Sequence, residues 1–288
     1  MEKIKKYAPL FLLICCAAGV ALIWYAVFYI EAHRDLVMTV FDIGQGDSIF
    51  IEMPNGNQVL IDGGPDDAVL AKLGAVLPFW NRTLDLVILT HPHADHVTGL
   101  ISVLKRYHVG MVLESGVNYA TPEYDEWRLL EKEKNVPVVI AHRGQVVHLS
   151  SKTQLNILTP FDSFIGASPK NVHDAMVVAK LRDGSATALL TGDAEKPLEY
   201  QLLFAGDNLA SDVLKVGHHG SKTSTTEDFL QAVSPKIAVI SVGRKNRYGH
   251  PAPEVVDRIA AFGAALFRTD RDHDVRFESD GKIFVRTE

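Results

Sequence analysis

The segment "LTHPHADHVTG", Leu89–Gly99, places three histidines and an aspartate within six residues. It follows the apolar run "LDLVILT" and leads into the helical pattern "HVTGLISVLKRY", so we expect a loop between a buried strand and a helix. Imidazole and carboxylate groups bind zinc, manganese and iron. On an extended strand end, His91 and His93 can face one ion, while Asp95 and His96 turn toward a second. The spacing therefore favours a metal site over a solvated polar loop.

Strand and helix patterns alternate on both sides of this segment. Upstream, "LVMTVFDI", "DSIFIEM" and "QVLIDGG" alternate as strands, with a hairpin turn at "PNGN", residues 54–57. Downstream, "VPVVIA", "QVVHLS" and "TQLNILTP" form a strand cluster, and "AMVVAKL" pairs with "TALLTGD" through a turn. Strand runs followed by helices occur twice, which predicts two mixed sheets packed face to face with helices outside.

A second metal-binding signal lies in "LLTGDAE", residues 189–195, where a strand ends at Gly192 and Asp193. A Gly-Asp pair after a strand is a common turn, so this signal alone is weak. Together with the histidine loop, it predicts that the Asp193 carboxylate bridges two ions.

Five segments occur in the order of a known family: "FDIGQGDSIFIEMPNGNQVLIDGG", "LTHPHADHVTGL", "LLTGDAE", "VLKVGHHGS" and "SVGRKNRYGHP", spanning residues 41–251. In these segments the chain resembles the metallo-β-lactamase superfamily. Within it, the chain is most similar to the hydrolase domain at the C-terminal end of ComEC-type DNA-uptake channels and their stand-alone relatives. The resemblance implies an α/β fold, the αββα sandwich, with the metal site at one edge between the sheets.

The resemblance also implies two sets of metal ligands that share Asp193. The full set is His91, His93, Asp95, His96, His173, Asp193 and His219. The segment "NVHDAM", residues 171–176, departs from the Asn/Ser-rich pattern expected there, and Asp174 is an alternative to His173 as ligand. An imidazole 20 residues before the bridging aspartate resembles the choline-phosphate esterases of the superfamily. Zinc is the expected metal, with manganese or iron as alternatives.

The pair His218 and His219 ends the strand pattern "DVLKVG". Adjacent side chains on an extended backbone point to opposite faces, so we expect the two rings to have different roles. The resemblance favours His219 as the ligand and leaves His218 as the alternative. The other ring would face the substrate and transfer a proton, or form a hydrogen bond to a neighbour that supports the site. His250 is a second candidate for that role or a packing residue, and the predicted catalytic residues are Asp95, His218 and His250.

Further polar residues are expected at the same edge. Asp62 in "LIDGG" resembles the superfamily carboxylate that orients a ligand histidine. Asp47 in "GQGDS" takes part in the site or forms a tight turn. The expected substrate-binding residues are Ser221, Lys222, Thr223, Asn246 and Tyr248. Hydroxyl groups and a lysine at 221–223 suit a phosphate group, although a solvated loop lysine is an equal alternative.

The N-terminal segment Tyr7–Ile30 holds 24 residues without a charge, enough to cross a bilayer as a helix. We expect residues 1–35 to form a cytoplasmic tail and an uncleaved single-pass membrane anchor (span about 7–30) and residues 36–288 to form the hydrolase domain. Lys3, Lys5 and Lys6 precede the segment, so the positive-inside rule predicts a catalytic domain outside the cytoplasm. A cleaved signal peptide is the alternative.

The charge balance argues against a large nucleic-acid surface. The chain carries 29 Lys and Arg against 35 Asp and Glu, a net charge of −6, whereas a sequence-independent nucleic-acid binder is usually basic. Affinity for phosphate must therefore be local. Both cysteines, Cys15 and Cys16, lie in the apolar segment, so the predicted hydrolase domain has no disulfide and no thiolate ligand.

These expectations define a membrane-anchored, two-metal hydrolase. Two cations lower the pKa of bound water and make a hydroxide nucleophile available at neutral pH. The expected substrate is a phosphodiester, with DNA as its specific form. The alternatives are a small envelope phosphodiester of the choline-phosphate type, a lactone, thioester or β-lactam, and a non-catalytic metal-dependent module of a DNA-uptake system.

Overall fold

The computed structural model describes residues 2–33 and 35–287. The chain divides between residues 35 and 36 into two compact units, Met1–Asp35 and Leu36–Glu288. The candidate site residues all lie in the second unit.

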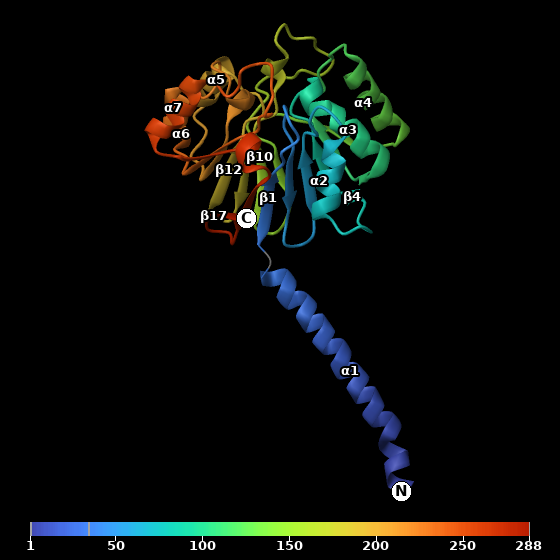
Figure 1. The fold of residues 1–288 in the computed structure, drawn as a ribbon. Coiled ribbons are helices and arrows are strands. Elements are labelled where there is room, and N and C mark those ends of the chain that lie inside the picture. Colours follow the sequence, from blue (N-terminus) through green and yellow to red (C-terminus); the bar gives the residue numbers. More distant parts are fainter. Residues whose placement is uncertain (1, 34, 288) are drawn as a thin grey trace. The chain divides into compact units, whose positions relative to one another are not determined.

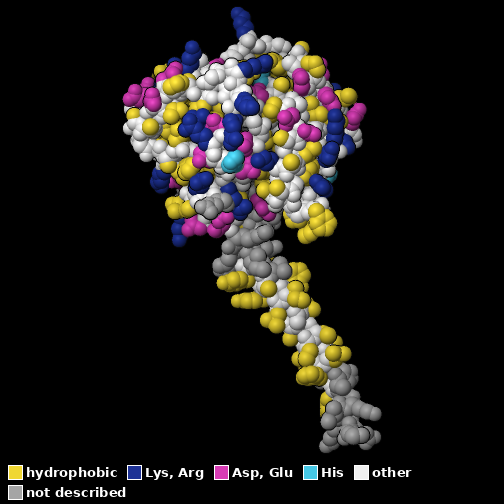
Figure 2. All heavy atoms as spheres, viewed as in Figure 1, with side chains coloured by type: hydrophobic (Ala, Val, Ile, Leu, Met, Phe, Trp, Pro, Cys, Tyr) yellow, Lys and Arg dark blue, Asp and Glu magenta, His cyan; other side chains and the backbone are white. Residues whose placement is uncertain are grey.

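The first unit contains the helix α1 (Glu2–His33), which covers the apolar N-terminal segment. Phe11, Leu12 and Trp24 are among its exposed apolar side chains. Figure 2 shows hydrophobic side chains along the helix. Within the described residues, however, no helix is long and apolar enough to span a membrane. The structure thus bears out helix formation over this segment but does not support the membrane span predicted for residues 7–30.

An eight-stranded sheet forms one half of the second unit, in the order β17–β16–β1–β2–β3–β5–β7–β8. Neighbours from β17 to β3 are antiparallel, and those from β3 to β8 are parallel. In chain order the strands are β1 (Leu36–Val40), β2 (Ile49–Glu52), β3 (Gln58–Ile61), β5 (Leu86–Ile88), β7 (Val112–Glu114), β8 (Val138–Ile140), β16 (Val275–Ser279) and β17 (Phe284–Thr287).

A seven-stranded sheet forms the other half, in the order β15–β14–β13–β12–β11–β10–β9. The strands from β15 to β12 are parallel, and those from β12 to β9 are antiparallel. In chain order they are β9 (Val146–His148), β10 (Thr153–Ile157), β11 (Ala179–Asp183), β12 (Ala186–Leu190), β13 (Val213–Lys215), β14 (Ile237–Ile240) and β15 (Ala265–Arg268). A further pair, β4 (Thr83–Leu84) and β6 (His108–Val109), forms a two-stranded sheet.

The two large sheets pack face to face, with helices on both outer sides (Figure 1). One apolar core joins side chains of both sheets, including Met38, Leu155 and Leu181. The helices α2 (Ala68–Val76), α3 (Ala94–Arg106) and α4 (Pro122–Glu133) pack on the first sheet. On the second sheet lie α5 (Lys196–Phe204), α6 (Glu227–Val233) and α7 (Pro253–Phe262), and the short helix α8 (Thr269–Asp272) follows β15. The predicted αββα sandwich is confirmed.

One part of the predicted strand pattern is wrong. Residues 136–160 were expected to form one strand cluster, but β8 pairs with β7 in the first sheet, whereas β9 and β10 belong to the second. The turn at residues 141–145 therefore carries the chain from one sheet to the other. Local alternation shows that a segment is extended, but not which of two apolar layers it joins.

Candidate metal centre

The histidine loop connects β5 to α3, as the sequence predicts. His91 is buried at the end of the strand, and His93 is the N-cap residue of α3, with an extended backbone. Asp95 and His96 therefore lie in the first helical turn. Because a strand end and a helix start have different side-chain directions, the two pairs of donors diverge into two groups.

A contact between two glycines fixes α3 against the turn after β3. A Cβ atom on Gly99 would lie 1.9 Å from the carbonyl oxygen of Gly63, a distance that no side chain tolerates. The Gly63 amide donates to the carbonyl oxygen of His96 at 2.8 Å, and the Gly99 amide donates to that of Gly64 at 3.0 Å. Backbone contacts thus help to hold the first turn of α3 against the turn after β3.

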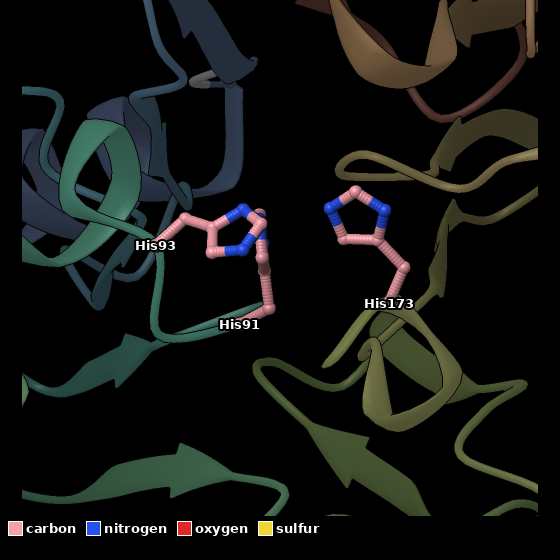
Figure 3. A group of neighbouring side chains, drawn as sticks. All are labelled: His91, His93 and His173. Atoms are coloured by element: carbon pink, nitrogen blue, oxygen red, sulfur yellow. The ribbon is translucent and has the colours of Figure 1, made fainter. Parts of the chain in front are cut away.

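His91, His93 and His173 form the first donor group. One ring nitrogen of each residue lies within 4.8 Å of the other two. Figure 3 shows the rings converging from two sides, with His91 and His93 on the loop before α3 and His173 on the 3₁₀ turn η1 (Val172–Ala175). Asp174, the alternative ligand, is exposed. This geometry fits one cation with three imidazole ligands.

Asp95, His96, Asp193 and His219 form the second donor group. The Oδ2 atom of Asp193 lies 3.3 Å from Nε2 of His96 and 3.4 Å from Nε2 of His219. It also lies 4.0 Å from Nε2 of His91, in the first group. Asp193 thus stands between the two groups, where a bridging carboxylate is expected.

Unpaired polar atoms provide an independent test of metal binding. The Nε2 atoms of His91, His96, His173 and His219 and the Oδ1 atom of Asp193 are buried without a hydrogen-bond partner in the described chain. Burying such atoms unpaired costs free energy, so native proteins rarely leave several together. Because these atoms belong to the two donor groups, the residues present fit divalent cations.

Electrostatics support the same conclusion. Burial lowers the pKa of His91 well below its usual value and keeps the ring neutral, as a ligand requires. Burial acts in the same direction on His96 and His219, but the neighbouring carboxylates together outweigh it. Asp193 and Asp62 hold the pKa of His96 well above its usual value. Asp193, with smaller contributions from Asp95 and Asp47, raises the pKa of His219 to about 9. The surroundings of Asp193 therefore favour positive charge. A divalent ion would supply that charge and would replace the protons on the rings of His96 and His219.

Asp62 lies behind His96, in the orienting position that the resemblance implies. Its Oδ2 atom accepts a hydrogen bond from Nδ1 of His96 at 2.7 Å, and Thr90 donates its amide and its hydroxyl to the same carboxylate at 2.8 and 2.6 Å. Asp62 adopts a left-handed backbone with φ of 58°. The carboxylate fixes the His96 ring so that Nε2 faces the donor group. Sequence reasoning did not identify Thr90 as part of this arrangement.

A buried ion pair between Asp47 and Lys215 lies beside the second donor group. Both side chains are inaccessible or nearly so, and the Lys215 ammonium also donates to the carbonyl oxygen of Gly192 at 3.0 Å. The other oxygen of Asp47 lies 3.5 Å from Nδ1 of His219. Asp47 therefore belongs to the surroundings of the site. Lys215 was not predicted, although a single charge within the apolar strand "DVLKVG" was a usable signal.

The expectation that His218 and His219 face opposite sides is wrong. The two residues lie in a 3₁₀ turn, η2 (Gly217–Gly220), and both have positive φ, 47° and 53°. A Cβ atom on Gly217 would lie 2.5 Å from the carbonyl oxygen of Ala194, so the chain turns sharply where it touches the neighbouring loop. As a result both rings approach Asp193, with Nε2 of His218 at 3.8 Å from its Oδ2 atom.

Glu195 connects His218 with His173 and was not predicted from the sequence. Its two carboxylate oxygens lie 3.3 Å from Nδ1 of His173 and 3.3 Å from Nδ1 of His218, and the Thr223 hydroxyl donates to it at 2.6 Å. His173, Glu195 and His218 thereby offer a further set of neighbouring donor atoms. The sequence feature that could have identified Glu195 is its position two residues after Asp193 in "TGDAE".

The predicted substrate-binding residues differ in their surroundings. Ser221 and Thr223 share a hydrogen bond of 2.9 Å, and Asn246 bonds within its own loop. Lys222 and Tyr248 are both exposed. His250 is half-buried, and its ring centroid lies 5.8 Å from that of His218. The structure thus brings both candidate proton-transfer histidines to one side of the centre.

Comparison with known proteins identifies relatives of the chain. ComE operon protein 3 of Bacillus subtilis (strain 168) is 30% identical over 287 residues, which are 94% of this chain and 36% of that protein. Competence protein ComA of Neisseria gonorrhoeae is 32% identical over 252 residues, 85% of this chain and 32% of that protein. The chain thus spans about a third of the length of these curated relatives.

A solved structure shows the same fold. The metallo-beta-lactamase fold protein YhfI of Bacillus subtilis aligns with a TM-score of 0.53 and 13% identity over 81% of this chain and 95% of that one. The family model described as the metallo-beta-lactamase superfamily matches residues 41–244, which include both donor groups. The chain belongs to the metallo-beta-lactamase superfamily.

Proposed function

We propose that the unit Leu36–Glu288 hydrolyses a phosphodiester, with DNA as the leading substrate. The observation that carries the proposal is the position of Asp193 between two donor groups, because two adjacent cations suit phosphodiester cleavage. Zinc suits this set of imidazoles and carboxylates, and manganese and iron are the alternatives. The proposal does not depend on membrane attachment.

The chain would hold one cation with His91, His93 and His173 and the other with Asp95, His96 and His219, while Asp193 serves both. When bound, the two ions provide water of lowered pKa and stabilise charge on the reacting phosphate. Asp62 keeps Nε2 of His96 directed at its ion, and Glu195 does the same for His173 through Nδ1.

His218 is the residue we assign to proton transfer. Glu195 contacts its Nδ1 atom at 3.3 Å and leaves Nε2 facing the centre, so the ring is oriented to give a proton to the departing oxygen. The side chain is partly open to solvent, which allows the proton to be restored from water. His250, beside it, is the second residue placed for this task.

The names of the relatives favour nucleic acid as the substrate. Two matched proteins are named for the ComE operon and for competence, and both are about three times as long as the aligned part. The surface itself is not strongly basic: acidic and basic side chains are interspersed over the visible face of the second unit (Figure 2). We therefore infer that nucleic acid is bound locally near the centre rather than along an extended track.

A substrate panel tests the proposal. The full chain is incubated, with zinc and with manganese, with single-stranded DNA, duplex DNA, RNA, an aryl phosphodiester and a β-lactam, and elemental analysis counts the bound ions. We expect two ions per chain and cleavage of phosphodiesters, and an Asp95→Ala/His96→Ala variant should abolish cleavage while the fold survives. Hydrolysis of the β-lactam alone, or one ion or none, would contradict the proposal.

A further inference from the structure

A row of rings leads from the metal centre to the surface. The His218 ring lies 5.8 Å from that of His250, and Tyr248 stacks on His250 at 5.9 Å with an angle of 14° between the rings. The guanidinium of Arg247 lies 5.2 Å from the centre of the Tyr248 ring. The outer member, Tyr248, is 57% exposed. Arg247 also donates to the Tyr248 hydroxyl oxygen at 3.2 Å. An exposed aromatic ring with a cation over it thus lies two rings away from the candidate proton-transfer group.

Asn246 fixes the loop that carries this row. Its amide nitrogen donates to the carbonyl oxygens of Gly243 and His250, and its carbonyl oxygen accepts from the amides of Tyr248 and His250 at 3.2 and 2.9 Å. All polar atoms of the side chain are therefore used within residues 243–250. The backbone that carries the rings is thus held by bonds within the loop itself.

The same loop concentrates positive charge on an otherwise acidic chain. Arg244, Lys245 and Arg247 lie within four residues of one another, and Lys222 is exposed on the adjoining turn at residues 221–223. Within the described residues, these four side chains take part in no ion pair with a carboxylate. Uncompensated cations beside an exposed ring are the features that bind a phosphate backbone and an unpaired base together.

We propose that residues 244–250 form a binding platform for single-stranded nucleic acid, which we call the stacking loop. A base takes the place of the Arg247 guanidinium on the Tyr248 ring, the cations contact the backbone, and the strand leads past His250 to the metal centre. A duplex is disfavoured because its bases are already stacked on one another and cannot offer a free face to Tyr248. The inference rests on the proposed phosphodiesterase function and specifies the substrate of that site.

Binding, rather than cleavage, tests this inference. Fluorescence anisotropy measures the affinity of an Asp95→Ala protein for a labelled short oligothymidylate, an oligouridylate and a duplex. We expect both single strands to bind more tightly than the duplex. Adding Tyr248→Ala should weaken single-strand binding about tenfold, whereas Tyr248→Phe, which keeps the ring, should retain it. Phe204→Ala, at an exposed residue of α5, is the matched control and should change nothing.

A Lys245→Ala/Arg247→Ala variant tests the electrostatic part. The logarithm of the binding constant falls linearly with the logarithm of the salt concentration. For this variant the slope should be less steep, by about 0.7 for each phosphate that the two cations no longer neutralise. The measurements are repeated with Asp95 intact and chelator present, so that a folding defect of the Asp95→Ala protein does not decide the result. Binding by the Tyr248→Ala protein equal to that of the Phe204→Ala control would overturn the inference.

The two proposals fail in distinguishable ways. If the chain cleaves no phosphodiester but binds oligothymidylate through Tyr248, the proposed function fails and the stacking loop stands. If it cleaves the aryl phosphodiester and the Tyr248 variants bind single strands alike, the stacking loop fails and the phosphodiesterase remains.

Discussion

His96 donates from Nδ1 to the Oδ2 atom of Asp62 over 2.7 Å, and this bond directs Nε2 of His96 toward Asp193. Asp62 is fully buried and would act on the candidate ion through the His96 ring. We expect Asp62→Ala to weaken binding of the ion in the second donor group and to lower activity about 10- to 100-fold. Titration with metal in competition with a chromogenic chelator measures the affinity, and Asp67→Asn, at an exposed residue before α2, is the control.

His219 and His218 should respond differently to replacement by alanine. His219 belongs to the second donor group, so His219→Ala should lose one ion per chain. His218 lies 3.8 Å from Asp193 and is held by Glu195, so His218→Ala should keep both ions and lower kcat. Elemental analysis and steady-state kinetics, made on the same samples, distinguish the two. The reverse pattern would exchange the assigned roles without changing the reaction.

The buried pair of Asp47 and Lys215 should be important for stability. Lys215→Met leaves the Asp47 carboxylate buried without its cation, which typically costs about 3–5 kcal/mol. Lys236→Met, which removes an exposed lysine paired with Asp212, should change the free energy of unfolding by less than about 1 kcal/mol. Urea unfolding measures both. Adding Asp47→Asn to Lys215→Met should restore part of the stability; no restoration would show that the pair does not act as a unit.

Glu131, on α4 and outside both donor groups, should make stability depend on pH. Burial, followed by the neighbouring carboxylate of Glu114, raises the pKa of Glu131 to about 8. In the unfolded chain the Glu131 carboxyl loses its proton near its usual pKa of about 4.5, whereas in the folded chain it keeps the proton up to about pH 8. The free energy of unfolding should therefore fall as pH rises from about 4.5 to about 8. Glu131→Gln should flatten that decline, whereas the exposed Glu133→Gln should not. Melting temperatures across this range measure the difference.

Features of the fold and the site that are local in sequence could be predicted. His91, His93, Asp95 and His96 are neighbours in the chain, so the change from strand to helix decides which donors face each other. Features that depend on distant segments could not be predicted in this way. Alternation alone did not show that β8 joins the first sheet, because either sheet would bury its apolar side.

Residues that act through contacts between loops were also missed. Glu195 gains its role only because η1 and η2 both approach it, and Lys215 is tolerated in a strand only because Asp47 lies opposite. The error at His218 and His219 came from treating the strand as continuing, whereas it ends at Lys215 and a left-handed turn follows. Such turns depend on the close approach of another backbone, which a sequence pattern does not contain.

The contact between Gly63 and Gly99 limits how this centre can change during evolution. A side chain at either position would push α3 away from the first sheet and displace the ligands in its first turn. Substitutions at Gly63 or Gly99 in that half of the site are therefore not expected to be tolerated. The opposite half is carried by η1, the turn at residues 221–223 and the stacking loop, and it presents Tyr248 and Lys222 to solvent. New substrate preferences would be expected to arise there, on the half that tolerates substitution.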